Sequence, residues 1–164
     1  MCKRRKIGRL EEGQVLKLME KNTISMFGAW QLVTFEFRKT DGSIIHPFGE
    51  EAQGTIIYTE SGRYSAQLMR KDRPKFKSGD QMKGTVEEIE TNYKGCISYF
   101  GTFQVNEKEG TISHHVESSI FPNMEGTEQK RYFELSENHL QLKTPPIRVD
   151  GEKVVGILQW ERVG

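Results

Sequence analysis

Hydrophobic and polar residues alternate along most of the chain after residue 25, with the period of two that is typical of β-strands. The clearest case is segment 95–123, where two alternating runs flank a turn at residues 107–110 (EKEG). The residues expected on the inward face of this hairpin are mostly apolar: Ile97, Tyr99, Gly101, Phe103, Val105, Ile112, His114 and Val116. Tyr99 and His114 bring polar atoms to that face, which favours a core that recognises a bound molecule.

Six further segments show a strand pattern and are separated by short turns: 26–37, 54–59, 63–69, 127–135, 139–143 and 154–162. Because the connections are short, we expect neighbouring strands to pair antiparallel. An even-numbered meander of this length closes most naturally into an up-and-down barrel, since closure removes exposed sheet edges. The pattern therefore predicts an all-β domain over residues 25–164, an antiparallel barrel of about eight strands that is wide enough for one small molecule.

The first 24 residues do not share this pattern. Residues 9–21 predict a short helix, which Gly13 weakens by about 1 kcal/mol relative to alanine. We interpret the basic residues 3–6 (KRRK) as a solvated terminus rather than a binding segment. Residues 1–24 are therefore expected to be an N-terminal extension that is helical or partly disordered.

A second helix is expected in the middle of the chain. Residues 70–84 are polar and contain proline and glycine, which predicts an exposed loop. Thr85 and Glu88 then have the spacing of a capping box, which would open a short helix that ends near Tyr93. Two interpretations stay open for this loop and helix: a lid over a cavity mouth, or a solvated connection at the sheet edge.

Composition narrows the functional classes. The 164 residues carry a formal net charge of +1, which removes the electrostatic argument for a nucleic-acid partner. No apolar run approaches the roughly 20 residues of a membrane span. The two cysteines, Cys2 and Cys96, lack metal-ligand spacing, and we interpret them as free thiols. Since no apolar segment of a secretory signal follows the N-terminal basic residues, we expect a cytoplasmic protein. We also expect it to be a monomer or a homodimer.

A series of short motifs is shared with a known family. The first strand carries Gly28-Ala29-Trp30, similar to the lipocalin G-x-W signature, and Arg162 stands where lipocalins place an arginine over that tryptophan. More specific motifs are 47–49 (PFG), 65–70 (SAQLMR), 72–74 (DRP), 99–102 (YFGT), 114–117 (HHVE), 121–123 (FPN), 144–146 (TPP) and 160–162 (WER). Together they resemble the lipocalin-like domain family of bacteria and fungi, from about residue 27 to the C-terminus.

The resemblance implies an eight-stranded lipocalin-like barrel with a ligand-sized interior, and it implies no particular reaction. Relatives by fold include carriers of apolar small molecules and cofactor-free cyclases or isomerases. We interpret Trp30 with Arg162 as structural, a cation–π contact worth about 0.5–2 kcal/mol at the barrel base. No cofactor is expected.

The histidines do not have the spacing of a metal site. His114 and His115 are adjacent on a strand and point to opposite faces, so they cannot hold one ion without a bulge. We therefore expect no metal. His114 has two open interpretations: a hydrogen-bonding or acid/base group at the cavity wall, or a buried histidine satisfied by a neighbouring strand.

Arg131 is the most informative charged residue. It shares a face with Gln129, Phe133 and Leu135, so its guanidinium is expected to point inward. A buried guanidinium must be paired or bound to an anionic or carbonyl-bearing ligand, because an unpaired buried charge is costly. Glu117 or Glu161 is the alternative partner within the chain.

Three functional hypotheses follow. The leading one is binding of a small, largely apolar molecule with a polar handle, by His114, Arg131, Tyr99, Gln67, Gln129 and Phe103. The second is a cofactor-independent isomerase, cyclase or hydrolase, in which His114 or Tyr99 moves a proton and Arg131 stabilises an oxyanion. The third is a barrel with a filled core that acts as an interaction module.

Overall fold

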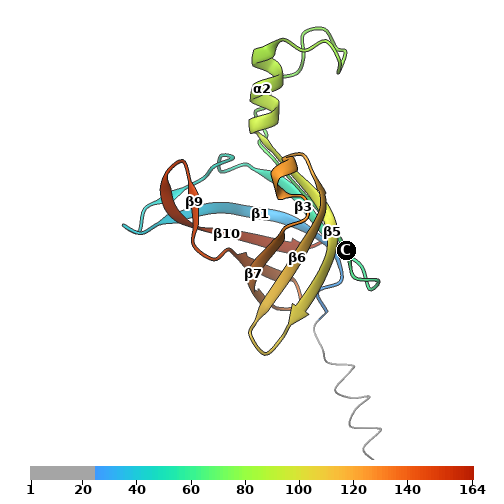
Figure 1. Ribbon diagram of the computed structural model, residues 1–164, viewed down its shortest axis with the longest axis vertical. Helices are drawn as coiled ribbons and strands as arrows, with labels where there is room; N and C mark the ends of the chain where they lie inside the picture. The colour runs from blue at the N-terminus through green and yellow to red at the C-terminus, as the bar shows by residue number, and fades with distance from the viewer. Residues whose placement is uncertain (1–24) are drawn as a thin grey trace, which may run out of the picture.

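Each of the eight alternating segments forms a strand in the computed structural model, which describes residues 25–164. The strands of the barrel are β1 (Gly28–Lys39), β3 (Gln53–Tyr58), β4 (Arg63–Met69), β5 (Cys96–Asn106), β6 (Thr111–Ser119), β7 (Glu128–Leu135), β8 (His139–Lys143) and β10 (Glu152–Arg162). All pairs are antiparallel, and the pairing of β1 with β10 closes the sheet into a barrel (Figure 1). The predicted eight-stranded antiparallel barrel is confirmed.

Two short strands were not predicted from the sequence. Strand β2 (Ile44–Ile45) pairs with β1, and β9 (Ile147–Val149) pairs with β10. They lengthen the sheet order to β2-β1-β3-β4-β5-β6-β7-β8-β10-β9 without changing the closure of the barrel. The helix predicted at residues 9–21 lies outside the described residues.

The period-two alternation places the core where the pattern predicted it. On β6, Ile112, His114 and Val116 are at most 3% exposed. On β5, Tyr99 and Phe103 are buried, as predicted for the same face. Val105 differs, because it lies next to the turn at the end of the hairpin and is 41% exposed.

A glycine allows close contact between β5 and β6. The register between these strands shifts between Phe100 and Gly101. A Cβ atom added at Gly101 would lie 1.9 Å from the carbonyl oxygen of His115. The absence of a side chain at Gly101 therefore permits this irregularity.

Arg162 and Trp30 hold the two closing strands together. The Arg162 Cζ atom lies 4.2 Å from the centre of the Trp30 ring, and Trp30 is fully buried. Arg162 also donates from Nε to the Glu137 carbonyl and from Nη1 to the Phe27 carbonyl, both at 2.8 Å. The Trp30 indole donates to the Met26 carbonyl at 2.8 Å. The structural role predicted for this pair agrees with these contacts.

The mid-chain helix α2 (Val86–Lys94) begins where the capping box predicted it. Thr85 Oγ1 accepts the Glu88 amide, and Glu88 Oε2 accepts the Thr85 amide. Glu88 Oε1 also accepts the amide of Lys77, which ties the preceding loop to the helix. Helix α2 projects from the end of the barrel that carries the short 3-10 helix η1 (Pro122–Met124) (Figure 1). Within residues 25–164, no helix has the length and apolar character that crossing a membrane requires.

Candidate ligand-binding site

The barrel contains a cavity of about 420 Å³. Most of its wall is apolar and comes from the inward faces of the strands: Phe35, Phe37, Ile56, Ala66, Leu68, Ile97, Leu142, Leu158 and Trp160. The segments near one barrel end complete it: Tyr93, Ile120, Phe121, Met124 and Ile147. The volume lies within the range of small-molecule pockets, roughly 300–1,000 Å³, so the barrel interior is not completely filled by its own side chains.

Four predicted site residues meet in this cavity. Tyr99 of β5, His114 of β6, and Gln129 and Arg131 of β7 all line it. They come from three consecutive antiparallel strands, in which His114 pairs with Gln129 and Ile112 with Arg131. The structure therefore gathers these four polar side chains on one side of the barrel.

His114 makes two hydrogen bonds inside the protein. Its Nδ1 atom lies 3.3 Å from the Gln129 carbonyl oxygen, which can only accept, so Nδ1 carries the hydrogen. Nε2 then accepts from the Tyr58 hydroxyl at 2.7 Å. Burial, and after it the charge of Arg131, lower the pKa of His114 to about 3. The ring is therefore neutral at pH 7, and the geometry favours the interpretation of a satisfied buried histidine.

Two tyrosines behind His114 were missed in the sequence. Tyr58 and Tyr64 pair directly across β3 and β4, and both are buried. The Tyr64 ring lies 4.6 Å from that of His114 and 5.8 Å from that of Tyr99, measured between centres. Burial raises the pKa of Tyr58 and of Tyr64, so both hydroxyls stay protonated. Their alternation with Ile56 and Ala66 was the signal that could have assigned them to the inward face.

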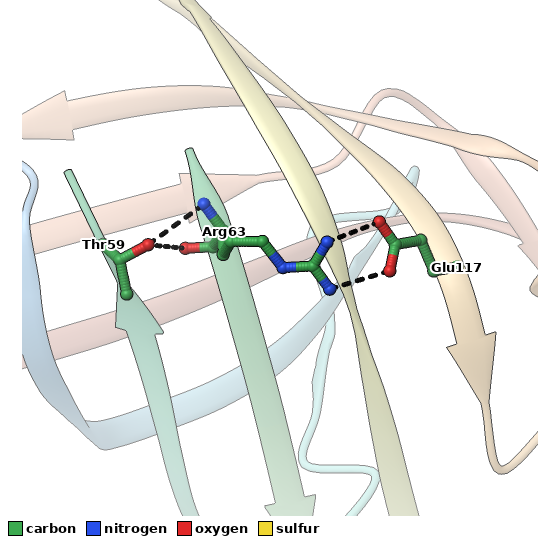
Figure 2. A network of polar contacts seen from close by, with 3 residues as sticks. All are labelled: Thr59, Arg63 and Glu117. Carbon is green, nitrogen blue, oxygen red and sulfur yellow. Dashed lines mark hydrogen bonds and ion pairs between the residues drawn. The ribbon is translucent and has the colours of Figure 1, made fainter. Parts of the chain in front are cut away.

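Arg131 has no carboxylate partner among the described residues. Its Nη1 atom donates to the Lys130 carbonyl at 2.8 Å. The predicted partner Glu117 instead forms a two-pronged ion pair with Arg63, with both N–O distances at 2.7 Å. Figure 2 shows this pair, together with Thr59, whose hydroxyl binds the Arg63 backbone. Glu161 forms no ion pair with Arg131 either. The expectation that Glu117 or Glu161 pairs with Arg131 is therefore wrong.

Two predicted site residues do not line the cavity. Gln67 lies on the outer face of β4, because Tyr64, Ala66 and Leu68 occupy the inward positions. Its Nε2 atom donates to the Ser65 hydroxyl at 2.7 Å. Phe103 faces inward but packs outside the cavity, with its ring centre 4.9 Å from that of Tyr58. Alternation places a residue on a face, but the depth of the cavity depends on the packing of all strands.

Metal ligands are not assembled in the part of the chain that the structure describes. No group of three or more His, Cys, Asp or Glu side chains within residues 25–164 is arranged to hold an ion. His115 points away from His114 and lies 3.7 Å from a Glu128 carboxylate oxygen. Cys96 is a free thiol at the cavity wall.

The fold and cavity define the class of protein: a small antiparallel barrel with room for one ligand. The family model of the lipocalin-like domain matches residues 27–163, and the chain belongs to this family. The chain is also 30% identical over 106 residues to the 4'-hydroxy-3'-methoxypropiophenone carrier protein ppsC of Aspergillus oryzae. That alignment covers 60% of this chain and 96% of the relative. The barrel and the carrier relative together support small-molecule binding in general.

Proposed function

We propose that this protein binds one small, largely apolar molecule with a polar handle inside the barrel. The observation that carries the proposal is the cavity of about 420 Å³, whose wall is mostly apolar and carries Tyr99, His114, Gln129 and Arg131 on one side. Burying about 200 Å² of apolar ligand surface is worth about 5 kcal/mol, before the cost of immobilising the ligand. The polar side of the wall would then fix the orientation of the ligand.

The relative from Aspergillus oryzae supports an aromatic ligand. Its name describes a carrier of 4'-hydroxy-3'-methoxypropiophenone, an aromatic ketone with hydroxyl and methoxy groups. Such a molecule combines a flat apolar body with oxygen atoms at its ends. Phe35, Phe37 and Trp160 offer aromatic surface for a body of this kind.

The site favours binding over proton transfer. Both ring nitrogens of His114 are engaged, by the Tyr58 hydroxyl and the Gln129 carbonyl. Its pKa of about 3 makes it a weak base at neutral pH. The cavity volume likewise does not favour an interaction module with a filled core.

The test is a fluorescence titration of the purified protein with 4'-hydroxy-3'-methoxypropiophenone and a panel of apolar aromatics. Trp160 lines the cavity, so a bound ligand should quench or shift its emission. Native mass spectrometry of the same samples should show one ligand per chain.

A matched pair of substitutions locates the binding. Ala66 lines the cavity, whereas the next residue, Gln67, lies on the outer face. We expect Ala66→Phe to weaken binding by about tenfold or more, since the added ring occupies ligand space, and Gln67→Phe to leave it unchanged. Unchanged affinity in an Ala66→Phe variant that keeps the circular dichroism of the original protein would place the ligand elsewhere and overturn the proposal.

A further inference from the structure

The ionisable groups at the cavity wall are unbalanced in charge. Arg131 is the one lining residue with a permanent charge, and no aspartate or glutamate lines the described cavity. His114 is neutral because burial lowers its pKa to about 3. The wall therefore presents one positive charge and no negative charge of its own.

Arg131 lines the same cavity as His114, and on the paired strands β6 and β7 it lies opposite Ile112, two residues from His114. Burial has the largest effect on the pKa of His114, and the charge of Arg131 lowers this pKa as well. Its one hydrogen bond among the described residues goes to the neutral carbonyl of Lys130. A carbonyl satisfies one N–H group but does not neutralise the charge, so most of the donors of this side chain remain available.

Two more polar groups at or behind the cavity wall lack a hydrogen-bond partner among the described residues. The Tyr64 hydroxyl and the Trp160 indole N–H are buried without a hydrogen bond. Trp160 lines the cavity, and the Tyr64 ring packs on those of His114 and Tyr99, which line it as well. An indole can only donate, and a protonated tyrosine can donate, so the surplus at this site is in donors.

We propose that the polar handle of the ligand is an ionised oxygen group, a carboxylate or phenolate, bound by Arg131. The inference rests on the proposed function and specifies its ligand class. A neutral ketone would accept hydrogen bonds from the half-buried guanidinium but would not neutralise its charge. An ionised oxygen forms charge-assisted hydrogen bonds, which are roughly twice as strong as neutral ones. The apolar body then lies against the aromatic and aliphatic wall.

Two fluorescent dyes with the same body test the charge requirement. 1-Anilinonaphthalene-8-sulfonate carries an ionised oxygen group, whereas N-phenyl-1-naphthylamine lacks it. We expect the full-length protein to bind the sulfonate about tenfold or more tightly than the neutral dye. Displacement of the neutral dye by 2-naphthoate and by 2-naphthamide repeats the comparison with a carboxylate, and we expect the carboxylate to compete more strongly.

Substitution of Arg131 separates its charge from its bulk. Arg131→Met keeps the length of the side chain, and we expect about a tenfold or larger loss for the sulfonate with less than a twofold change for the neutral dye. Lys130→Met is the matched control, because Lys130 is the adjacent cation, does not line the cavity and pairs with Glu109. It should change neither affinity.

The outcomes distinguish the two claims. If both dyes bind the original protein equally and 2-naphthamide competes as well as 2-naphthoate, the ionised handle is overturned while the proposed function stands. If neither dye nor any aromatic ligand binds, the proposed function fails and this inference fails with it. The comparison on the original protein does not depend on the folding of the Arg131→Met variant.

Discussion

At the scale of single residues, the polar side of the cavity depends on how each group is satisfied. His114 is neutral because burial, and after it the charge of Arg131, lower its pKa, while the Tyr58 hydroxyl and the Gln129 carbonyl satisfy both of its ring nitrogens. Arg131 differs, since it keeps its charge and finds only a backbone carbonyl among the described residues. The same face thus combines a polar residue satisfied within the protein with a charged residue that we propose binds the ligand.

The neutral state of His114 predicts how stability depends on pH. In the unfolded chain its pKa is near 6.5, whereas in the folded protein it is about 3. The unfolded state therefore binds the extra proton as the pH falls, so the stabilisation is complete above pH 6.5 and is lost progressively toward pH 3. From these two values we expect His114 to reduce the free energy of unfolding by about 2 kcal/mol between pH 7 and pH 5.

Urea denaturation at pH 5, 6 and 7 measures this effect. His114→Gln is the control, because glutamine can still form hydrogen bonds but does not titrate. The fall in stability over this pH range should be smaller in His114→Gln than in the original protein by about 2 kcal/mol. Parallel pH profiles for the two proteins would contradict the assignment.

At the scale of secondary-structure elements, helix α2 connects the exposed loop to the cavity. Tyr93, near its C-terminal end, lines the cavity, and the rest of the helix projects beyond the barrel (Figure 1). Its N-terminal end is held by the capping box of Thr85 and Glu88. The helix has little contact with the barrel core, so its stability depends on this local arrangement.

Removal of the cap should loosen α2 without affecting the barrel. We expect Thr85→Ala to destabilise the helix by about 1 kcal/mol, because the Glu88 amide loses its acceptor. Hydrogen exchange of the amides in residues 86–94 should then accelerate about fivefold, while exchange in β5 and β6 stays unchanged.

The matched control is Thr91→Ala, the same change at an exposed position within the helix. It removes no cap and should not accelerate exchange, since alanine has the higher helix propensity. Equal acceleration in both variants would mean that the capping box does not hold this helix.

At the scale of the whole molecule, the barrel exists because its first and last strands meet. Strand β1 pairs with β10 from Trp30–Arg162 to Lys39–Val154, and Arg162 covers the buried Trp30 at one end. The side-chain interactions of Arg162 join the start of β1, the residues before it and the turn at Glu137. These interactions stabilise the contact between the two ends of the barrel domain, because Arg162 and Phe27 are more than 130 residues apart in the sequence.

Loss of this contact should destabilise the whole barrel. We expect Arg162→Met to lower the free energy of unfolding by about 2–4 kcal/mol, through the lost cation–π contact and the charged hydrogen bonds. Urea denaturation, followed by tryptophan fluorescence and circular dichroism together, measures the change. Arg38→Met is the control: Arg38 pairs with Glu36 at the surface and should contribute less than about 1 kcal/mol. Similar losses in both variants would contradict the closing role of Arg162.

The sequence by itself determined the strands, their inward faces and the start of α2. These features depend on residues two to four positions apart, as in the alternation of Ile112, His114 and Val116 or the capping box of Thr85 and Glu88. Local spacing is enough in such cases, because the side chains of one element share a face or a turn. The series of short motifs from 47–49 (PFG) to 160–162 (WER) also carried the family resemblance.

Only the tertiary structure decided which inward residues face open space and which partners they have. Phe103 and Tyr99 share a face, but only Tyr99 lines the cavity. Glu117 was available to Arg131 in the sequence, yet it binds Arg63, which lies on a neighbouring part of the outer surface. The bond between Tyr58 and His114 joins residues 56 positions apart. Register and barrel closure set such distances, and no local pattern along one strand encodes them.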